Sequence, residues 1–394
     1  MNLLSAAELL AGTDRPFVEL DKTRCLHHLS QFATCEACYD ICPVEAIQPA
    51  KPPTLDNQKC QQCGACLAVC PTDAYRGNDG FGSLLKVLKR VEAKELELVC
   101  NRNPYGEQGF SKDSLAVQTR ECLVSLGWGA YLILAALGFE RILIRTDACA
   151  DCVWAQLQDR IKSQVDFAKS LLKNWAKSDS IQWIDQIAKP HQRPIWDVSN
   201  PPLSRRDFFR MAIRQGEVAF AKLENLESND SFASTRNRTR MMAVINHFPI
   251  PESYSVGNIL SAEFATLTVS EDCSACGVCA RVCTTQALTF NVDPQNASFQ
   301  LLFSAQKCVG CDLCQNVCLP EAIQVKHEIT PDQLLGAQET LLQQGDLVRC
   351  ERCGTLMAAR PAQTLCPTCE KRRQNPFASI LPPHFQRNFT GENK

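Results

Sequence analysis

The alternation of apolar and polar residues is clearest in the middle of the chain. Short apolar runs at residues 95–100, 115–122 and 140–149 have the pattern of strands, and residues 129–138 and 152–176 have helical periodicity. Strands that alternate with helices in this way predict a small parallel sheet with helical crossovers.

One apolar stretch in this region, residues 122–139, carries no charge and reaches the lower length limit for a membrane span. Three glycines interrupt it, and the strand-like segment ERILIR follows at once. We therefore expect a buried helix of the α/β layer and no membrane span.

Cysteines dominate the rest of the pattern. The 394-residue chain holds 24 of them, and most recur in a fixed rhythm. The run 60–70 spaces its four cysteines by two, two and three residues and is followed by proline. The same spacing returns at 273–283 and 308–318, and a shortened version occupies 35–42. The runs continue into the similar tails PTDAY, TTQAL, LPEAI and PVEAI, so an internal repeat governs the sequence.

This rhythm suits metal ligation better than disulfide bonding, because neighbouring cysteines on a tight loop are poorly placed to pair with each other. Metal-bound thiolates indicate a reducing compartment, so we expect a cytoplasmic protein. The net charge of −2 and the pI near 6.3 give no electrostatic footprint for nucleic acid. The amino terminus lacks the pattern of a secretory signal, and Ser5-Ala-Ala-Glu8 predicts a capping box that opens a short helix.

The run 60–70 is similar to the cysteine run of bacterial two-cluster ferredoxins, in which the last cysteine of each run ligates the other cluster. The resemblance implies two [4Fe–4S] clusters in each of two modules, four in all. It implies three complete ligand sets, which we name site B (Cys42, Cys60, Cys63, Cys66), site C (Cys273, Cys276, Cys279, Cys318) and site D (Cys283, Cys308, Cys311, Cys314).

The remaining set, site A, departs from the pattern. Phe32 stands where a cysteine three residues before Cys35 belongs, and Cys25 is the nearest candidate. We assign site A to Cys25, Cys35, Cys38 and Cys70, with a loop bridging the displacement. Two alternatives stay open: a three-iron cluster that lacks Cys25, and His27 or His28 as the fourth ligand.

Four more cysteines belong to the predicted sheet. Cys100, Cys122 and Cys149 each end a predicted strand, and Cys152 follows three residues later. Because ligands collect at the carboxyl edge of a parallel sheet, we expect these thiols to converge on one middle site. Residues 93–160 resemble the small iron–sulfur domain of hydrogenase delta subunits, electron adaptors to heterodisulfide reductase, which implies an additional [2Fe–2S] cluster. Buried structural cysteines and a redox-active Cys149–Cys152 dithiol are the alternatives.

The last cysteines form two CxxC knuckles, after a helix predicted over residues 331–344. Such a pair of knuckles predicts a zinc ribbon with four thiolates around one Zn ion, and a rubredoxin-like iron is the alternative. The four predicted ligands are Cys350, Cys353, Cys366 and Cys369.

The segment between the middle region and the second module has fewer signals. Residues 204–210 (SRRDFFR) are close to a twin-arginine signal, but their mid-chain position favours a helix cap, with a helix to about Leu226. A similar Ser-Arg-Arg element occurs in the ferredoxin that helps mature periplasmic nitrate reductase, which implies contact with a molybdoenzyme or its chaperone. Residues 227–256 have the composition of a linker. The arginines at 236, 238 and 240 predict a solvated face or a docking patch for an acidic partner.

The predicted fold class is α+β and multidomain: two ferredoxin-like dicluster modules, a small α/β parallel-sheet domain and a zinc ribbon. The expected boundaries are 1–80 (helix and first module), 81–200 (α/β domain), 201–260 (helix and linker), 261–330 (second module), 331–372 (helix and zinc ribbon) and 373–394 (flexible tail).

The whole resembles polyferredoxins, which implies a carrier that relays single electrons between a cytoplasmic oxidoreductase and a partner, such as a dehydrogenase, hydrogenase or molybdoenzyme. No Gly-rich phosphate loop follows a strand, and we predict no catalytic residue, no nucleic-acid partner and no membrane span. Two alternatives remain open: a maturation factor for a molybdoenzyme or other metalloenzyme, and a thiol/disulfide oxidoreductase that uses the middle-domain cysteines.

Overall fold

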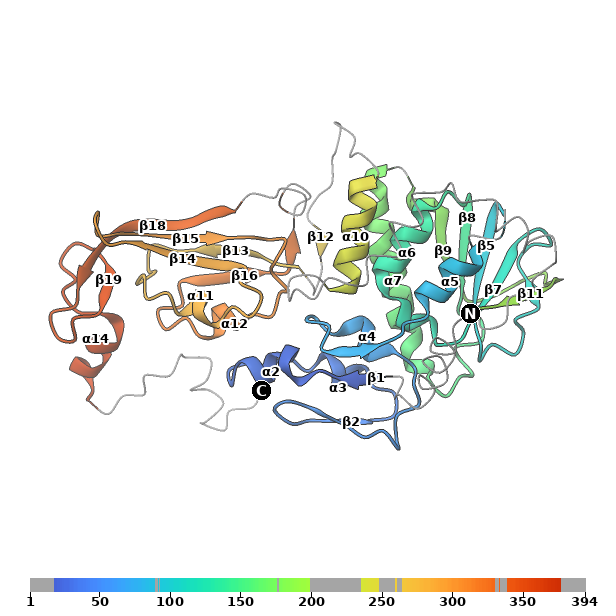
Figure 1. The fold of residues 1–394 in the computed structure, drawn as a ribbon, viewed down its shortest axis with the longest axis horizontal. Coiled ribbons are helices and arrows are strands. Elements are labelled where there is room, and N and C mark those ends of the chain that lie inside the picture. Colours follow the sequence, from blue (N-terminus) through green and yellow to red (C-terminus); the bar gives the residue numbers. More distant parts are fainter. Residues whose placement is uncertain are drawn as a thin grey trace, which may run out of the picture. The chain divides into compact units, whose positions relative to one another are not determined.

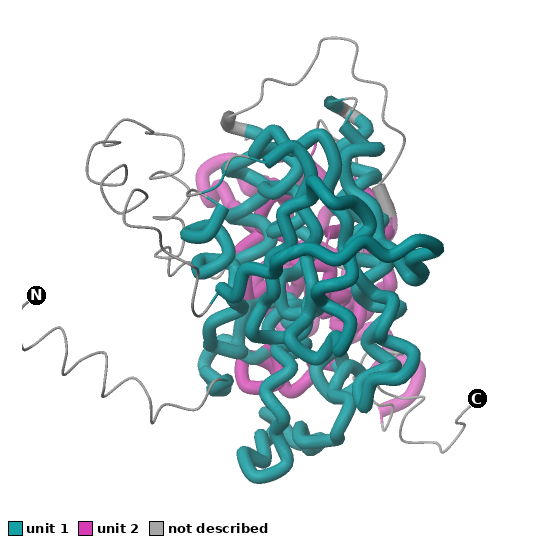
Figure 2. The backbone as a smooth tube through the Cα atoms, turned by 90° about the vertical axis from the view of Figure 1, so that its right-hand side faces the viewer, with its two compact units in different colours: residues 1–25, 36–230, 234–255 teal, residues 26–35, 231–233, 256–394 magenta. Residues whose placement is uncertain are grey.

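The computed structural model describes residues 18–88, 91, 93–175, 177–198, 235–247, 259–260, 264–329, 333 and 339–376. The chain forms two compact units (Figure 2): unit 1 comprises residues 1–25, 36–230 and 234–255, and unit 2 comprises 26–35, 231–233 and 256–394. The helices expected at Ser5 and from Ser204 to Leu226 lie outside the described residues.

Unit 1 begins with short elements around the first cysteine runs (Figure 1). Strand β1 (Val18–Leu20) pairs antiparallel with β4 (Tyr75–Gly77), and β2 (Ile47–Gln48) pairs with β3 (Thr54–Leu55). The helices of this part are η2 (Lys22–Arg24), α3 (Ala37–Ile41) and α4 (Ala65–Val69). Val18, Ile47, Leu67 and Tyr75 pack with Cys38 and Cys66 into one small core, so the cysteines are part of what this module buries.

The middle of unit 1 is a parallel sheet of five strands in the order β11-β7-β5-β8-β9, as the sequence pattern predicts. The strands are β5 (Glu95–Cys100), β7 (Leu115–Thr119), β8 (Arg141–Arg145), β9 (Ile181–Ile184) and β11 (Ile195–Asp197), with a small antiparallel pair of β6 (Gln108–Gly109) and β10 (His191–Gln192). The helices are α5 (Phe81–Leu88), η3 (Leu123–Leu126), α6 (Gly127–Ala136), η4 (Ala155–Leu157), α7 (Gln158–Leu172), η5 (Lys173–Trp175) and η6 (Ser178–Ser180).

The apolar stretch at 122–139 forms the buried helix α6, as expected. Every residue of α6 from Gly127 to Ala135 is buried, and Trp128 meets Phe167 of α7 edge to face at 4.9 Å between ring centroids. Its uniform apolarity therefore reflects burial on all sides. Among the described residues, no helix combines the length and the apolarity that crossing a bilayer requires.

The prediction of a linker over 227–256 is wrong for its centre, where α10 (Arg236–His247) forms a helix of unit 1. Its basic run is also not a solvated face or a docking patch, because Arg238 and Arg240 are buried. Arg236 lies 3.5 Å from Asp73, and Arg240 lies 2.7 Å from Asp79. The polar composition of this segment suggested a linker because Asp73 and Asp79, which pair with its arginines, are far away in the sequence.

Unit 2 contains the second module and the end of the chain. Strand β13 (Thr266–Val269) pairs with β16 (Ile323–Lys326), and β12 (Ile259–Leu260) pairs with β17 (Glu328–Ile329), all antiparallel. The helices are α2 (Leu26–Leu29), α11 (Val278–Val282), α12 (Leu313–Asn316) and α14 (Pro367–Gln374). A four-stranded sheet has the order β14-β15-β18-β19, with β14 (Leu288–Asp293), β15 (Ser298–Phe303), β18 (Thr340–Arg349) and β19 (Leu356–Ala358).

Strands β14 and β15 form a hairpin, and at its turn the Asp293 carboxylate accepts the N–H groups of Gln295 and Asn296. The helix predicted over 331–344 is wrong for residues 340–344, which belong to β18. Strand β18 pairs with β15 on one side and with β19 on the other. Pairing with an edge that would otherwise be open overrides the helical propensity of this segment, which is rich in Leu and Gln.

Candidate metal centres

The internal repeat of the sequence is also a repeat of backbone conformation. In all four tails the third residue has a left-handed backbone, with φ between 49° and 54°, although none of the four is glycine: these are Glu45, Asp73, Gln286 and Glu321. Such a conformation costs a non-glycine residue energy, so the surrounding structure must hold it in place.

The left-handed turn points the next backbone N–H at a cysteine sulfur. Ala74 donates to Cys70 Sγ at 3.1 Å, and Ala46 and Ala287 donate in the same way to Cys42 and Cys283, both at 3.2 Å. In the fourth repeat the N–H groups of Ala322 and Ile323 lower the pKa of Cys318 against the larger effect of burial, which raises it. N–H donors directed at sulfur stabilise a thiolate ligand and tune the potential of a bound cluster.

The thiols of site B lie close together. Burial raises the pKa of Cys63 to about 11, and the neighbouring thiols of Cys42 and Cys60 raise it further. Burial likewise raises the pKa of Cys66, which Cys63, Cys60, Cys70 and Cys42 all affect. Cys42 therefore stands with the second cysteine run, as the crossover pattern requires, and four thiolates this close together would repel one another unless a positive centre binds them.

Site A is only partly assembled within unit 1. Cys38 and Cys70 both pack around Tyr75, and burial together with these thiols and Cys66 raises the pKa of the Tyr75 hydroxyl well above its ordinary value. Cys25 is buried at the end of η2, and Cys35 ends the segment Leu26–Cys35 that belongs to unit 2.

The histidines considered for site A have other surroundings. The ring nitrogen Nε2 of His27 lies 2.6 Å from the carbonyl oxygen of Cys35, so this nitrogen faces the backbone. His28 is in the short helix α2. The fourth ligand of site A therefore stays a prediction, with Cys25, one of the two histidines, or a three-iron cluster without it as the alternatives.

Sites C and D show the same crossover. Burial raises the pKa of Cys318, and Cys276 and Cys273 of the first run lie near enough to raise it further. Burial raises the pKa of Cys311 to about 12, with contributions from Cys308 and from Cys283 of the other run. In this module, the first cysteines of each run therefore lie near the last cysteine of the other run.

The middle site also comes together, at the carboxyl edge of the sheet. A hydrogen bond from Cys122 lowers the pKa of Cys100 to about 7, while the same contact and burial raise the pKa of Cys122, which Cys149 affects as well. Burial raises the pKa of Cys149 to about 12, and the thiols of Cys100 and Cys152 add to it. Strands β5, β7 and β8 thus deliver these cysteines to one place.

The donors around the middle site resemble those of the ferredoxin modules. The N–H of Arg102 points at Cys100 Sγ and that of Trp154 at Cys152 Sγ, both at 3.5 Å. Among the described residues, the only group of three or more ligand atoms close enough for a single ion is in the ribbon, so the middle thiols are too spread for one ion.

A buried network of ion pairs and hydrogen bonds lies next to the carboxyl edge of the sheet. Glu97 of β5 is fully buried, accepts hydrogen bonds from Arg145, Arg193 and Ser114, and keeps a lowered pKa because these bonds outweigh burial. Arg145 also binds both carboxylate oxygens of Asp147, at 2.7 and 2.8 Å, two residues before Cys149. The network fixes the loop that carries Cys149 and Cys152.

In the ribbon, the sulfurs of Cys350, Cys353, Cys366 and Cys369 all lie within 4.8 Å of one another. Cys353 and Cys366 are 3.8 Å apart, which is about the separation that a tetrahedral ion with Zn–S bonds of about 2.3 Å requires. The N–H of Cys366 donates to Cys350 Sγ at 3.3 Å and is the main reason that the pKa of Cys350 falls to about 6. The donor set and its spacing therefore fit zinc.

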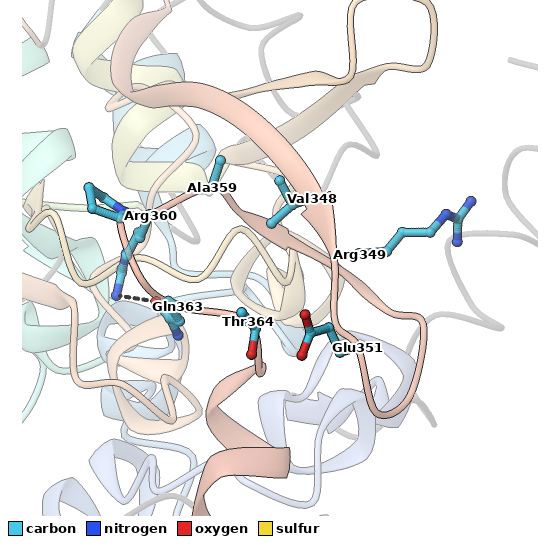
Figure 3. Close-up of a pocket in the computed structure, with 8 residues that line it drawn as sticks. Val348, Arg349, Glu351, Ala359, Arg360, Gln363 and Thr364 are labelled. Atoms are coloured by element: carbon cyan, nitrogen blue, oxygen red, sulfur yellow. Dashed lines mark hydrogen bonds between the residues drawn. The ribbon is translucent and has the colours of Figure 1, made fainter.

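A shallow pocket adjoins the ribbon and contains Glu351, Arg360 and Gln363 (Figure 3). Arg360 and Gln363 point toward each other, with 3.4 Å between Nη1 and Oε1. Arg360 also donates to the carbonyl oxygen of Cys273 at 3.0 Å, so a ribbon residue contacts the first cysteine loop of site C. In the sequence, only its place between the two knuckles marks Arg360.

Two segments of the chain, residues 15–74 and 272–322, match the 4Fe-4S dicluster domain family. No curated protein matches the chain. The two matched segments contain all the cysteines of sites A to D. Together the two dicluster domains indicate an iron–sulfur electron-transfer protein.

Proposed function

We propose that this chain is a polyferredoxin-type relay, which takes single electrons from a cytoplasmic oxidoreductase and passes them to a partner protein. The observation that carries the proposal is the crossover of thiols in both modules, where Cys42 and Cys318 each stand with the other run. Two cluster sites that exchange ligands in this way are necessarily close neighbours, which favours transfer between them.

The residues would hold the clusters as follows. Sites A, B, C and D would each bind one [4Fe–4S] cluster, and the middle site (Cys100, Cys122, Cys149, Cys152) would bind a [2Fe–2S] cluster. The ribbon cysteines Cys350, Cys353, Cys366 and Cys369 would hold structural zinc. A bound cluster supplies one-electron chemistry, and the protein supplies thiolate ligands, backbone N–H donors and the exclusion of water.

A thiol/disulfide oxidoreductase that uses Cys149 and Cys152 has less support. Such enzymes need a cysteine whose pKa lies below the ordinary value; burial raises the pKa of Cys149 to about 12, and the middle-site thiol with a lowered pKa is Cys100, outside the Cys149–Cys152 pair. No observation on the described residues favours the role of a maturation factor over that of a relay.

The test is metal and sulfide analysis of anaerobically purified protein, combined with EPR during a reductive titration. We expect about sixteen irons from sites A to D, about two more from the middle site and about one zinc. A folded, colourless protein without iron would refute the proposal. A count lower by about one iron, with a three-iron EPR signal, would show that site A lacks its fourth ligand.

A further inference from the structure

Two loops of the middle site each place one residue against the same loop of the first module, and a third loop packs on one of these residues. Trp154 follows Cys152 by two residues, and its indole Nε1–H donates to Oε1 of Gln61 at 2.9 Å. Gln61 lies directly after Cys60 of site B. All these residues belong to unit 1.

The Cys100 loop packs on Trp154 itself, and the Cys122 loop touches the site B loop a second time. Arg102, two residues after Cys100, places its guanidinium carbon 3.9 Å from the centroid of the Trp154 ring. Ser125, three residues after Cys122, packs against Gly64, where a Cβ atom would stand 2.5 Å from the serine Cβ. Gly64 follows Cys63 of site B and has a left-handed φ of 76°. The two loops are therefore in direct contact, with no room for a side chain between them.

The contact is buried. Trp154 is only 5% exposed, and its backbone N–H points at Cys152 Sγ. One residue therefore contacts a sulfur of the middle site through its backbone and the Cys60–Cys63 loop of site B through its ring. The residues at the contact belong to the loop of site B; none of them is a ligand of site A.

We propose that Trp154 and Gln61 form an electron junction between the middle site and site B. This inference rests on the proposed function, since it requires both sites to be loaded. One electron leaves one site as the other takes it up, so the donor site is oxidised and the acceptor site reduced by one unit. No proton moves and no further oxidant or reductant is needed. Site B, rather than site A, is then the branch point from which electrons enter or leave the sheet domain.

The test follows electron redistribution after a rapid photochemical reduction of the full-length loaded protein. The variants Trp154→Leu, Trp154→Phe and Gln61→Leu are compared with the wild type by transient absorbance and freeze-quench EPR. We expect several-fold slower equilibration between the two sites in Trp154→Leu, and a smaller but measurable slowing in the two variants that remove only the hydrogen bond. Because both partners act through one bond, Gln61→Leu should add nothing in the Trp154→Phe background.

A matched control exists in the same domain. Trp183 also donates its indole N–H to a side chain, Asp166 at 3.3 Å, and also carries a cation over its ring, Lys162 at 4.4 Å. Its hydrogen bond does not reach a cysteine loop. Trp183→Phe should therefore leave the equilibration rate unchanged.

The outcomes are distinguishable. Wild-type rates in Trp154→Leu, with both sites loaded, would overturn the junction and leave the proposed function intact. If the Cys100→Ser and Cys122→Ser variants bound as much iron as the wild type, the middle site would hold no cluster. This second result would overturn the junction together with that part of the proposed function. Slower equilibration in Trp154→Leu with an unchanged iron count would support the junction, because a structural defect would also lower the iron count.

Discussion

Arg240 and Asp79 form a buried ion pair, with 2.7 Å between Nη2 and Oδ2 and at most 7% exposure of either side chain. The guanidinium also donates to the carbonyl oxygen of Leu126, and Arg236 of the same helix reaches Asp73 and Asp79. Helix α10 thereby ties the tail of the second cysteine run to the end of η3. This contact holds together the two parts of unit 1 that carry site B and the middle site.

Breaking this pair should loosen α10. Asp79→Asn leaves Arg240 buried without its charge partner, which costs about 3–5 kcal/mol. We expect faster amide hydrogen exchange in α10 and α6, measured by mass spectrometry. The double variant Asp79→Leu/Arg240→Met should recover part of the loss, because a buried pair can be replaced by apolar residues, while the contacts of Asp79 with Arg236 and with the Phe81 N–H stay lost.

The control for this prediction is the exposed pair Lys94–Glu140, in which both side chains face solvent. Glu140→Gln should leave exchange unchanged, since exposed pairs contribute little. Equal exchange in Asp79→Asn and the wild type would contradict the assigned role of α10.

The left-handed residues of the repeat give a second prediction. Gln286 has φ of 54° and an exposed side chain. Gln286→Val forces a β-branched residue into this conformation, at a cost of about 1–2 kcal/mol, whereas Gln286→Gly is tolerated. We expect the valine variant to lose its visible cluster absorbance faster in denaturant and the glycine variant to match or exceed the wild type.

Gln324→Val is the matched control, because this exposed glutamine lies in strand β16, where valine is favourable. If both valine variants lost their clusters at the same rate, the backbone turn would not be what protects the clusters.

These features show which parts of the structure the sequence could predict. The cysteine runs are local patterns, and the apolar runs ending at Cys100 and Cys149 predict both the parallel sheet and the edge where thiols meet. Helix α10 escaped prediction because Arg236 and Arg240 are paired with acids about 160 residues earlier in the chain. Trp154 escaped for the same reason, since its partner Gln61 is 93 residues away. Strand β18 was missed because the neighbour that makes it a strand, β15, lies outside any local window.

Metal analysis of ribbon variants gives a third prediction. Cys366→Ser removes one of four thiolates whose sulfurs lie within 4.8 Å of one another. We expect loss of about one zinc per chain, with the iron content unchanged, because structural zinc needs all four ligands. Cys311→Ser, a site D variant, should show the reverse, with iron lost and zinc kept. Loss of iron from Cys366→Ser with no zinc in the wild type would identify a rubredoxin-like site.

The last prediction concerns the charge of Arg360. Its guanidinium donates to the carbonyl oxygen of Cys273 and, through its charge, opposes the effect of burial on the Cys273 thiol, whose pKa is raised. A positive charge beside the first cysteine loop of site C stabilises the added electron of a reduced cluster there. Arg360→Gln should therefore lower the midpoint potential of that cluster by about 1 kcal/mol, on the order of 40 mV for one electron. The measurement is an EPR redox titration.

Arg349→Gln is the control for this charge, because Arg349 is exposed and donates instead to the carbonyl oxygen of Gly354 within the ribbon. Arg349→Gln should leave the midpoint potential of the site C cluster unchanged. Arg360→Lys, which keeps the charge, should retain most of the wild-type midpoint potential. Equal shifts in Arg360→Gln and Arg349→Gln would mean that only the net charge of the ribbon matters. A shift confined to Arg360→Gln identifies a contact through which the ribbon sets the redox properties of the neighbouring module.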